Sequence, residues 1–275
     1  MTAVSERKHE RAVLTGQSWE GSGIGTQIVV LAGRSLRPVF SPTRIFFSLL
    51  QPLVLLLLFS QVLRAIGETS YFPDNVSYVD YLMPAIIVVT SIAAAVGTGV
   101  GLAADMKNGV ISRLRSMPIS RVSVLVGRSI AGLVRAAIEV TILLITAMVV
   151  FEFTAAGGVP GMLGAVLLSL VISWSFGWVF LAAASWLGGS ENLHTLSMLL
   201  LMVLQFGSSA FVPLASMPDY IEFFAAINPL TYGIDAARAM VLGEPTGGAV
   251  FITVGVCTVI ALAGGSVAVR GFNRE

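Results

Sequence analysis

The sequence predicts an all-α membrane protein with six transmembrane helices, an N-terminal amphipathic interfacial helix, and a short re-entrant helical hairpin between helices five and six. Two observations support this fold class. Hydrophobic residues make up 56% of the 275 residues and charged residues only 11%, about half the charged fraction of an average soluble domain. Six stretches contain the roughly 20 mainly apolar residues with which a helix crosses a bilayer.

The elements follow in order along the chain. Residues 1–23 are polar and charged, which is typical of a disordered N-terminal arm and not of a cleaved signal peptide. Residues 24–42 are expected to form a helix on the membrane surface that is interrupted at Pro38 and Pro42. The six transmembrane helices are expected over residues 44–66, 81–104, 123–151, 161–187, 193–212 and 247–269.

Lysines and arginines are distributed unevenly across the predicted membrane. Fourteen of the 16 fall at the termini, in the loop after the second span, or at the adjoining end of the third span. Because positively charged segments stay in the cytoplasm, both termini and this loop are predicted to be cytoplasmic. The basic residues form no domain of their own, so nucleic acid is not an expected partner. The single cysteine, Cys257, excludes an intramolecular disulfide.

The loop after the second span, residues 105–121, is the most basic internal segment and reads DMKNGVISRLRSMPISR. Gly109 permits a turn there. Residues 111–117 can then form one or two turns of helix that end at Pro118.

Within this short helix, Arg113 and Arg115 flank Leu114. An apolar centre with charged edges suits insertion into a groove of a soluble partner, so the segment is a candidate coupling element. The alternative is a loop that only sets the topology, and such loops are common in membrane proteins.

Charged residues continue into the third span, where Arg121, Arg128 and Arg135 repeat every seven residues and Glu139 follows Arg135 by four. Arg135 and Glu139 can therefore pair on one helix face. A charge near the membrane centre costs about 2.5–3.5 kcal/mol, so we predict a structural or gating ion pair that faces protein or water. The alternatives are an Arg135 side chain that snorkels to the surface and an ion site of a secondary transporter.

The second span carries glycines at alternate positions, Gly97, Gly99 and Gly101. They include a G-x-x-x-G pattern, which allows helices to approach closely. We interpret the pattern first as a packing device and second as a contact between two copies of the chain.

The segment after the fifth span is too polar and too rich in proline for a plain span. Asn228 followed by Pro229 is typical of a helix N-cap and first residue, and Gly243 of a helix stop. The helix between them is about 21 Å long, so a hairpin that dips into the outer leaflet is expected. Asp235 and Arg238 can pair within it. The hairpin is a candidate outer gate or, alternatively, an extracellular cap.

Motifs for enzyme chemistry are missing from the sequence. A P-loop requires G-x-x-x-x-G-K followed by Ser or Thr, and neither Lys8 nor Lys107 follows such glycines. No cofactor is therefore expected in this chain, and any ATP and Mg²⁺ that supply its energy would have to bind to a separate subunit. Two histidines and one cysteine do not form a metal-ligand set, and no catalytic constellation is found.

Three segments resemble the ABC type-2 transporter permease family. NPLTYGIDAAR, which starts at Asn228, is similar to the C-terminal signature of the family. The pattern D-x-K-x-G-x-x-x-R-L-x-x-x-P-I-S-R over residues 105–121 is similar to its cytoplasmic loop, and R-S-L-R-P…Q-P-L over residues 34–53 also fits. The resemblance runs from about residue 25 to the C-terminus and is greatest to drug-export permeases of the daunorubicin- and doxorubicin-resistance kind.

The resemblance implies an ABC type-2 transmembrane domain over residues 24–275. It also implies a dimer with a second permease copy or paralogue, and coupling helices docked on cytoplasmic ABC ATPase subunits. With Arg115 added from the residues themselves, the expected coupling loop comprises Asp105, Lys107, Gly109, Arg113, Leu114, Arg115 and Pro118. With Asp235 added as the partner of Arg238, the expected outer signature comprises Asn228, Pro229, Tyr232, Asp235 and Arg238.

The expected function is that of a transmembrane permease subunit of an ABC exporter in a bacterial plasma (inner) membrane. It would move a hydrophobic drug-like or lipid-like substrate out of the cell, with membrane lipid as a further partner. The alternatives are an ion-coupled secondary transporter or channel, for which Arg135 and Glu139 would be the ion site, and an ABC exporter of polysaccharide or glycolipid.

Overall fold

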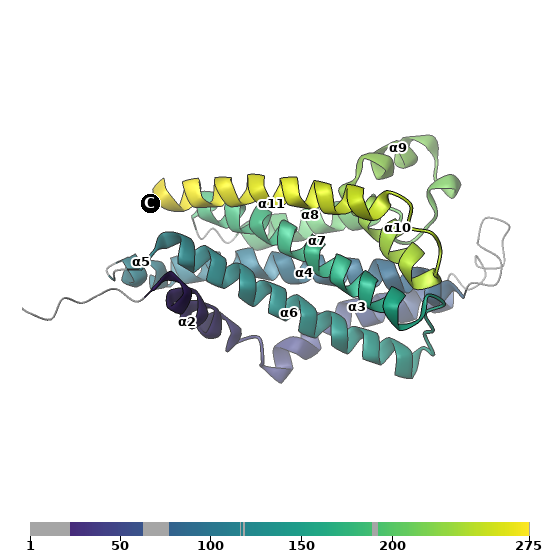
Figure 1. The fold of residues 1–275 in the computed structure, drawn as a ribbon, viewed down its shortest axis with the longest axis horizontal. Helices are drawn as coiled ribbons and strands as arrows, with labels where there is room; N and C mark the ends of the chain where they lie inside the picture. Colours follow the sequence, from purple (N-terminus) through teal and green to yellow (C-terminus); the bar gives the residue numbers. More distant parts are fainter. Residues whose placement is uncertain (1–22, 63–76, 116, 118, 189–191, 275) are drawn as a thin grey trace, which may run out of the picture.

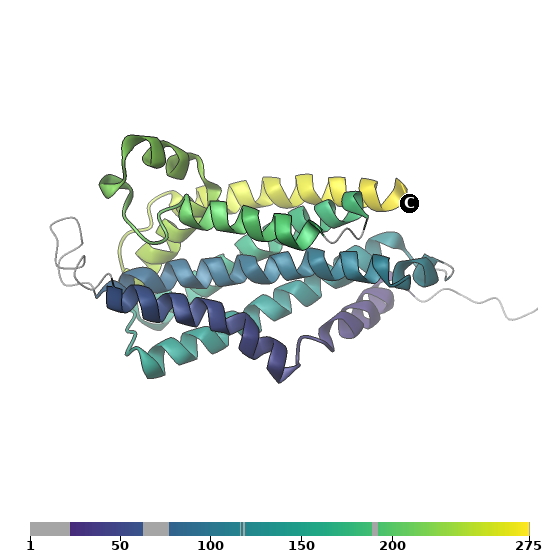
Figure 2. The ribbon, with the colours of Figure 1, turned by 180° about the vertical axis from the view of Figure 1, so that it is seen from behind.

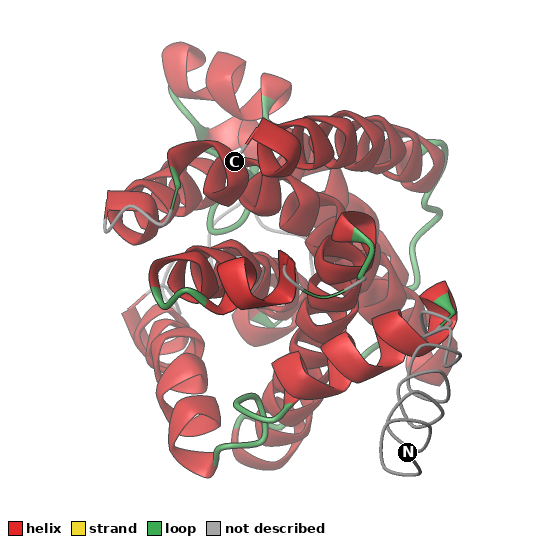
Figure 3. Cartoon of the chain, turned by 90° about the vertical axis from the view of Figure 1, so that its left-hand side faces the viewer, coloured by secondary structure: helices red, strands yellow, loops and turns green. Residues whose placement is uncertain are grey.

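The computed structural model describes residues 23–62, 77–115, 117, 119–188 and 192–274, and every regular element in these ranges is a helix (Figure 3). The N-terminal arm predicted for residues 1–23 lies outside the described residues except for Gly23. The helices are α2 Ile24–Leu36, α3 Pro42–Val62, α4 Tyr78–Lys107, α5 Val110–Arg115, α6 Arg121–Val150, α7 Gly158–Leu187, α8 Asn192–Phe206, a 3₁₀ turn Leu214–Ser216, α9 Asp219–Ile227, α10 Pro229–Leu242 and α11 Ala249–Arg274.

Within the described ranges, five helices are long and apolar enough to cross a membrane, namely α3, α4, α6, α7 and α11. They coincide with five of the six predicted spans. Residues 63–66 of the first predicted span lie outside the described residues.

The fifth predicted span, residues 193–212, is longer than the helix that the structure contains. α8 has 15 residues and ends at Phe206, which corresponds to about 22 Å of helix against a hydrocarbon core of roughly 30 Å. The chain leaves the helix at Gly207, and the carbonyl oxygens of Leu204 and Gly207 accept hydrogen bonds from the Asn228 side chain. Among the described residues, five helices thus have spanning length, and the fifth predicted span corresponds to the shorter apolar helix α8.

α4 is the central helix of the bundle and packs against α3, α6, α7, α8 and α10. Its sequence is apolar all round, as expected for a helix that is enclosed by others. Leu82, Ile87 and Val96 on α4 are fully buried. α3 and α8 flank α4 on one face of the molecule (Figure 2), whereas α7 and α11 pack together beside it.

The two ends of the bundle differ in character (Figure 1). α2, α5 and the C-terminal end of α11 lie at one end, called here the α5 end, and α9 and α10 lie at the other, the α9 end. α2 packs against α6 through Leu31 and Ala32 and exposes Val29 and Val30. Residues 37–41 form the turn between α2 and α3, which we call the elbow, and Pro38 and Pro42 lie where the sequence predicted an interruption.

Candidate functional site

The predicted coupling loop forms the tip of the α5 end. α4 ends at Lys107, Gly109 adopts a positive φ of 68° that favours glycine, and α5 begins at Val110. Arg113 on α5 is exposed. Pro118 and the side chain of Arg115 lie outside the described residues.

Leu114 does not project from this tip as the centre of a knob. It is half-buried and packs against the core cluster that contains Leu102 and Leu125, so much of its apolar surface already contacts the bundle. Met117 is the exposed large apolar residue of this loop, at 52% exposed. Leu114 therefore packs α5 onto the bundle, and its role in coupling stays a prediction.

Asp105 likewise turns toward the bundle. Its Oδ2 accepts a hydrogen bond from Nη1 of Arg128 on α6 at 2.6 Å. The two side chains are 32% and 17% exposed. Asp105 thus ties the α5 end of α4 to α6, and Arg128, which the sequence placed only on the charged face of the third span, is part of the site.

Arg135 and Glu139 form the second ion pair of the same helix face. Nε of Arg135 donates to Oε1 of Glu139 at 2.8 Å, and the Glu139 side chain is only 5% exposed. Because a buried carboxylate without a partner is costly, the hydrogen bond from Arg135 stabilises Glu139 within the bundle.

Glycines of α4 provide the space for both arginines. A Cβ atom at Gly97 would collide with the guanidinium group of Arg135, and one at Gly101 with that of Arg128. A Cβ at Gly99 would instead lie 2.5 Å from the backbone oxygen of Phe180 on α7. The two glycines of the G-x-x-x-G pattern, Gly97 and Gly101, therefore leave room for arginine side chains. Gly99, which lies between them, allows α4 and α7 to pack closely.

Two cavities meet at the Arg135–Glu139 pair. The first, of about 410 Å³, opens at the α5 end between α2, α3, α4 and α6. The second, of about 220 Å³, lies between α3, α4 and α8, where Gln51 and Gln205 accompany mainly apolar residues. Both cavities are lined by Arg135 and Glu139, so this pair separates a charged cavity from a mainly apolar one.

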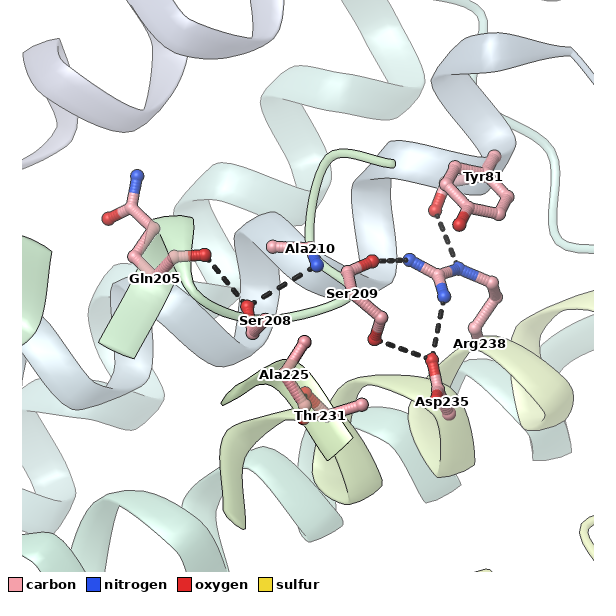
Figure 4. A network of polar contacts seen from close by, with 9 residues as sticks. All are labelled: Tyr81, Gln205, Ser208, Ser209, Ala210, Ala225, Thr231, Asp235 and Arg238. Carbon is pink, nitrogen blue, oxygen red and sulfur yellow. Dashed lines mark hydrogen bonds and ion pairs between the residues drawn. The ribbon is translucent and has the colours of Figure 1, made fainter. Parts of the chain in front are cut away.

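The α9 end is held together by Arg238 on α10 (Figure 4). Its guanidinium group donates to Oδ1 of Asp235 at 2.8 Å, to the Ser209 carbonyl at 2.9 Å and to the Tyr81 carbonyl at 3.2 Å. The group also lies over the Tyr81 ring, with Cζ 3.8 Å from the ring centroid. Arg238 thus connects α10, the loop after α8 and the first turn of α4.

Asn228 forms the corner between α8, α9 and α10. Its Oδ1 accepts from the backbone N–H of Leu230 as the N-cap of α10, and its Nδ2 donates to Leu204 and Gly207 at the end of α8. Pro229 is the first residue of α10, and Gly243 ends it in the left-handed conformation, at the bounds that the sequence predicted. Tyr232 donates from its hydroxyl to the Ala226 carbonyl of α9.

The arrangement of α5, the charged α4–α6 face and the α9–α10 corner coincides with a family pattern. The model of the ABC-2 type transporter family matches residues 26–242, which include all three regions. The chain belongs to the ABC-2 type transporter family.

Curated relatives in this family include transport permeases. The chain is 27% identical over 202 residues to the daunorubicin resistance ABC transporter permease protein DrrB1 of Streptomyces coeruleorubidus, a match that covers 74% of this chain and 70% of that protein. It is 26% identical to the probable doxorubicin resistance ABC transporter permease protein DrrC of Mycobacterium tuberculosis, over 80% of each chain. It is 29% identical to the putative transport permease ycf38 of Porphyra purpurea, over 72% of this chain and 67% of that one.

For this ABC-2 family member, the sequence did not indicate the cavity at the α5 end. Arg34 at the end of α2 and Arg44 at the start of α3 line the same cavity as Arg128 and Arg135. The seven-residue spacing in the third span indicated Arg128, but no spacing relates Arg34 and Arg44 to it.

Proposed function

We propose that this chain is the transmembrane permease subunit of an ATP-driven ABC exporter that moves a hydrophobic drug-like or lipid-like substrate out of the cell. The observation that carries the proposal is the family match over residues 26–242, which extends from α2 through α10. Relatives named as daunorubicin and doxorubicin resistance permeases support the substrate class.

ATP hydrolysis belongs, in this proposal, to separate ABC ATPase subunits that dock on the α5 end in the cytoplasm. The exposed Arg113 and Met117 of the α5 loop support this docking, because an exposed apolar side chain beside a charge suits a groove on a soluble partner. Both termini are then cytoplasmic, in agreement with the positive-inside rule.

A second permease copy or paralogue covers the face of α3 and α8 in the proposed assembly. Gln51 is exposed near the middle of α3, and the cavity beside it contains Gln205, Arg135 and Glu139. Polar groups at this depth are unfavourable next to lipid. A protein neighbour on this face would shield them.

The exported substrate is proposed to pass along this same α3–α8 face toward the α9 end. The cavity between α3, α4 and α8 is lined by Phe47, Leu55, Ile86, Met198 and Leu201, among others. Such a lining suits an apolar molecule with few polar groups. Arg238 and its partners would form the outer closure that opens when the ATPase subunits close.

Co-purification from the native cells tests the ATPase part of the proposal. A tagged chain is extracted in a mild detergent, and the eluate is assayed for a bound ATPase subunit and for ATP hydrolysis. We expect a stoichiometric ATPase, and we expect Arg113→Glu to reduce its recovery strongly while Arg37→Glu, an exposed arginine outside α5, leaves it unchanged.

Transport separates the proposal from its alternatives. Daunorubicin accumulation in cells that express the chain with its ATPase should fall, and the fall should vanish when ATP binding by the ATPase is abolished. A chain that purifies alone even after cross-linking, and whose transport follows a proton gradient, would instead indicate a secondary transporter with Arg135 and Glu139 as the ion site.

A further inference from the structure

The cavity at the α5 end carries an excess of positive charge. Four arginines line it, and we call it the arginine cavity after them. Among the described residues, the only other ionisable side chains in its lining are those of Asp105 and Glu139. The four are Arg34, Arg44, Arg128 and Arg135.

The two carboxylates neutralise only two of these arginines. Asp105 pairs with Arg128, and Glu139 pairs with Arg135. Within the part of the chain that the structure describes, Arg34 and Arg44 make no ion pair or side-chain hydrogen bond. Arg34 and Arg128 line the same cavity, where their like charges repel each other. Among the described residues, the cavity therefore has two uncompensated positive charges, which an anionic ligand would balance.

The unpaired arginines lie at the mouth of the cavity, on the two sides of the elbow. Arg34 is in the last turn of α2 and Arg44 in the first turn of α3, and both are exposed. Pro38, Val39 and Ile45 line the wall between them. An anion that enters here meets Arg34 and Arg44 first and the buried face of α6 beyond them.

A large apolar surface adjoins this charged mouth. Phe40 in the elbow and Phe46 and Phe47 on α3 are 60%, 63% and 65% exposed. Phe46 and Phe47 follow Arg44 by two and three residues, and their rings make an edge-to-face contact. Charge for a head group and apolar surface for acyl chains are thus adjacent on one edge of the bundle.

We propose that the arginine cavity binds the phosphate head group of an anionic membrane lipid, whose acyl chains lie along the start of α3. Arginine guanidinium groups bind phosphate through paired, charge-assisted hydrogen bonds. Basic pockets between membrane helices on the cytoplasmic side commonly hold anionic head groups. The volume of about 410 Å³ is within the range of ligand sites. Free phosphate or another small anion is the alternative source of the same chemistry.

The test of this site requires neither the ATPase subunit nor the exported substrate, so it stands apart from the test of the proposed function. The purified chain in a non-ionic detergent is titrated with short-chain phosphatidylglycerol, short-chain phosphatidylcholine or inorganic phosphate. The readouts are ligand-induced thermal stabilisation, which reports affinity, and retention of natural phosphatidylglycerol in native mass spectrometry.

The test variant is Arg34→Gln with Arg44→Gln, and its matched control is Arg37→Gln, an exposed arginine of the elbow that does not line the cavity. Neither test residue has an internal partner among the described residues, so the unliganded stability should not fall. We expect phosphatidylglycerol to bind saturably, with a dissociation constant at least about tenfold higher in the double variant and unchanged in the control.

Several outcomes would overturn the assignment. Phosphatidylglycerol that binds the double variant as it binds the unmodified chain would exclude the arginines as the site. Equal binding of zwitterionic phosphatidylcholine would exclude charge recognition. Inorganic phosphate that binds as tightly as phosphatidylglycerol would show a small-anion site and not a lipid site.

Discussion

Arg128 and Arg135 are held two helical turns apart on α6, each by a carboxylate and each in the space left by a glycine of α4. A guanidinium group inside a helix bundle is stable only while its charge is matched and its volume is accommodated. The carboxylates meet the first requirement and Gly97 and Gly101 meet the second. At the scale of single residues, both requirements can be tested separately.

Replacing Glu139 with Gln should destabilise the protein by about 2 kcal/mol, because Arg135 loses a charged hydrogen-bond partner. Transport should also fall if the pair separates the two cavities as proposed. Thermal unfolding in detergent and drug accumulation in cells measure the two effects. Glu222→Gln, on the exposed face of α9, is the control. Unchanged stability together with unchanged transport would mean that Arg135 and Glu139 are a solvated surface pair.

Replacing Gly97 with Ala should destabilise the protein by about 1–3 kcal/mol, since the added methyl group forces the Arg135 guanidinium from its position. Gly255→Ala on α11 is the matched control, because its Cβ would meet nothing within 4 Å and alanine is the better helix former. In thermal unfolding, the melting temperature should therefore fall for Gly97→Ala and rise for Gly255→Ala. Equal melting temperatures would contradict the role of Gly97 as the space for Arg135.

At the scale of elements, the α9–α10 corner depends on one side chain that serves two helices. Asn228 caps the start of α10 through its oxygen and the end of α8 through its nitrogen. The residue thus joins three helices at the α9 end, where Arg238 makes the second connection through Tyr81 and Ser209.

Asn228→Asp separates the two functions of this residue. Aspartate retains the N-cap acceptor but loses both donated bonds and places a negative oxygen opposite two carbonyls. We therefore expect it to destabilise at least as much as Asn228→Ala, by more than the ~1 kcal/mol typical of a lost N-cap. Ser77→Ala, which removes the N-cap of α4 and one exposed hydrogen bond to the Asp80 carboxylate, provides the reference value in the same unfolding experiment. If the Asn228→Asp variant were as stable as the unmodified chain, the N-cap of α10 would be the only stabilising role of this side chain.

The same elements show which parts of the structure a sequence can predict. The start of α10 at Pro229 and its stop at Gly243 follow from signals within one helical turn, and the Arg135–Glu139 pair follows from a spacing of four. The fifth span was predicted to end at residue 212, but α8 ends at Phe206. The contact at this end comes from Asn228, 24 residues after Leu204, so it leaves no local signal in the sequence of α8. The pair of Asp105 with Arg128 links different helices, as does the arginine cavity, so no periodic pattern within one helix could reveal them.

At the scale of the whole molecule, the α3–α8 face is the part of the bundle whose chemistry does not suit lipid. α8 is too short to cross the hydrocarbon core, Gln51 is exposed on α3, and a cavity with buried charge lies between the two helices and α4. The exposed surface of α11, by contrast, consists mainly of apolar residues such as Phe251 and Val259, which suit lipid. This difference predicts that the proposed second permease copy binds on the α3–α8 face.

Cysteine cross-linking tests this prediction directly, because Cys257 is the only native cysteine. In a Cys257→Ser background, Val203→Cys on α8 should form a disulfide-linked dimer when native membranes are oxidised, and Val259→Cys on α11 should remain monomeric. Both positions are exposed valines, 69% and 66% exposed, so the two thiols differ mainly in the face that carries them. Cross-linking from Val259→Cys and not from Val203→Cys would place the second copy on α11 and leave the polar groups of the α3–α8 face to another partner.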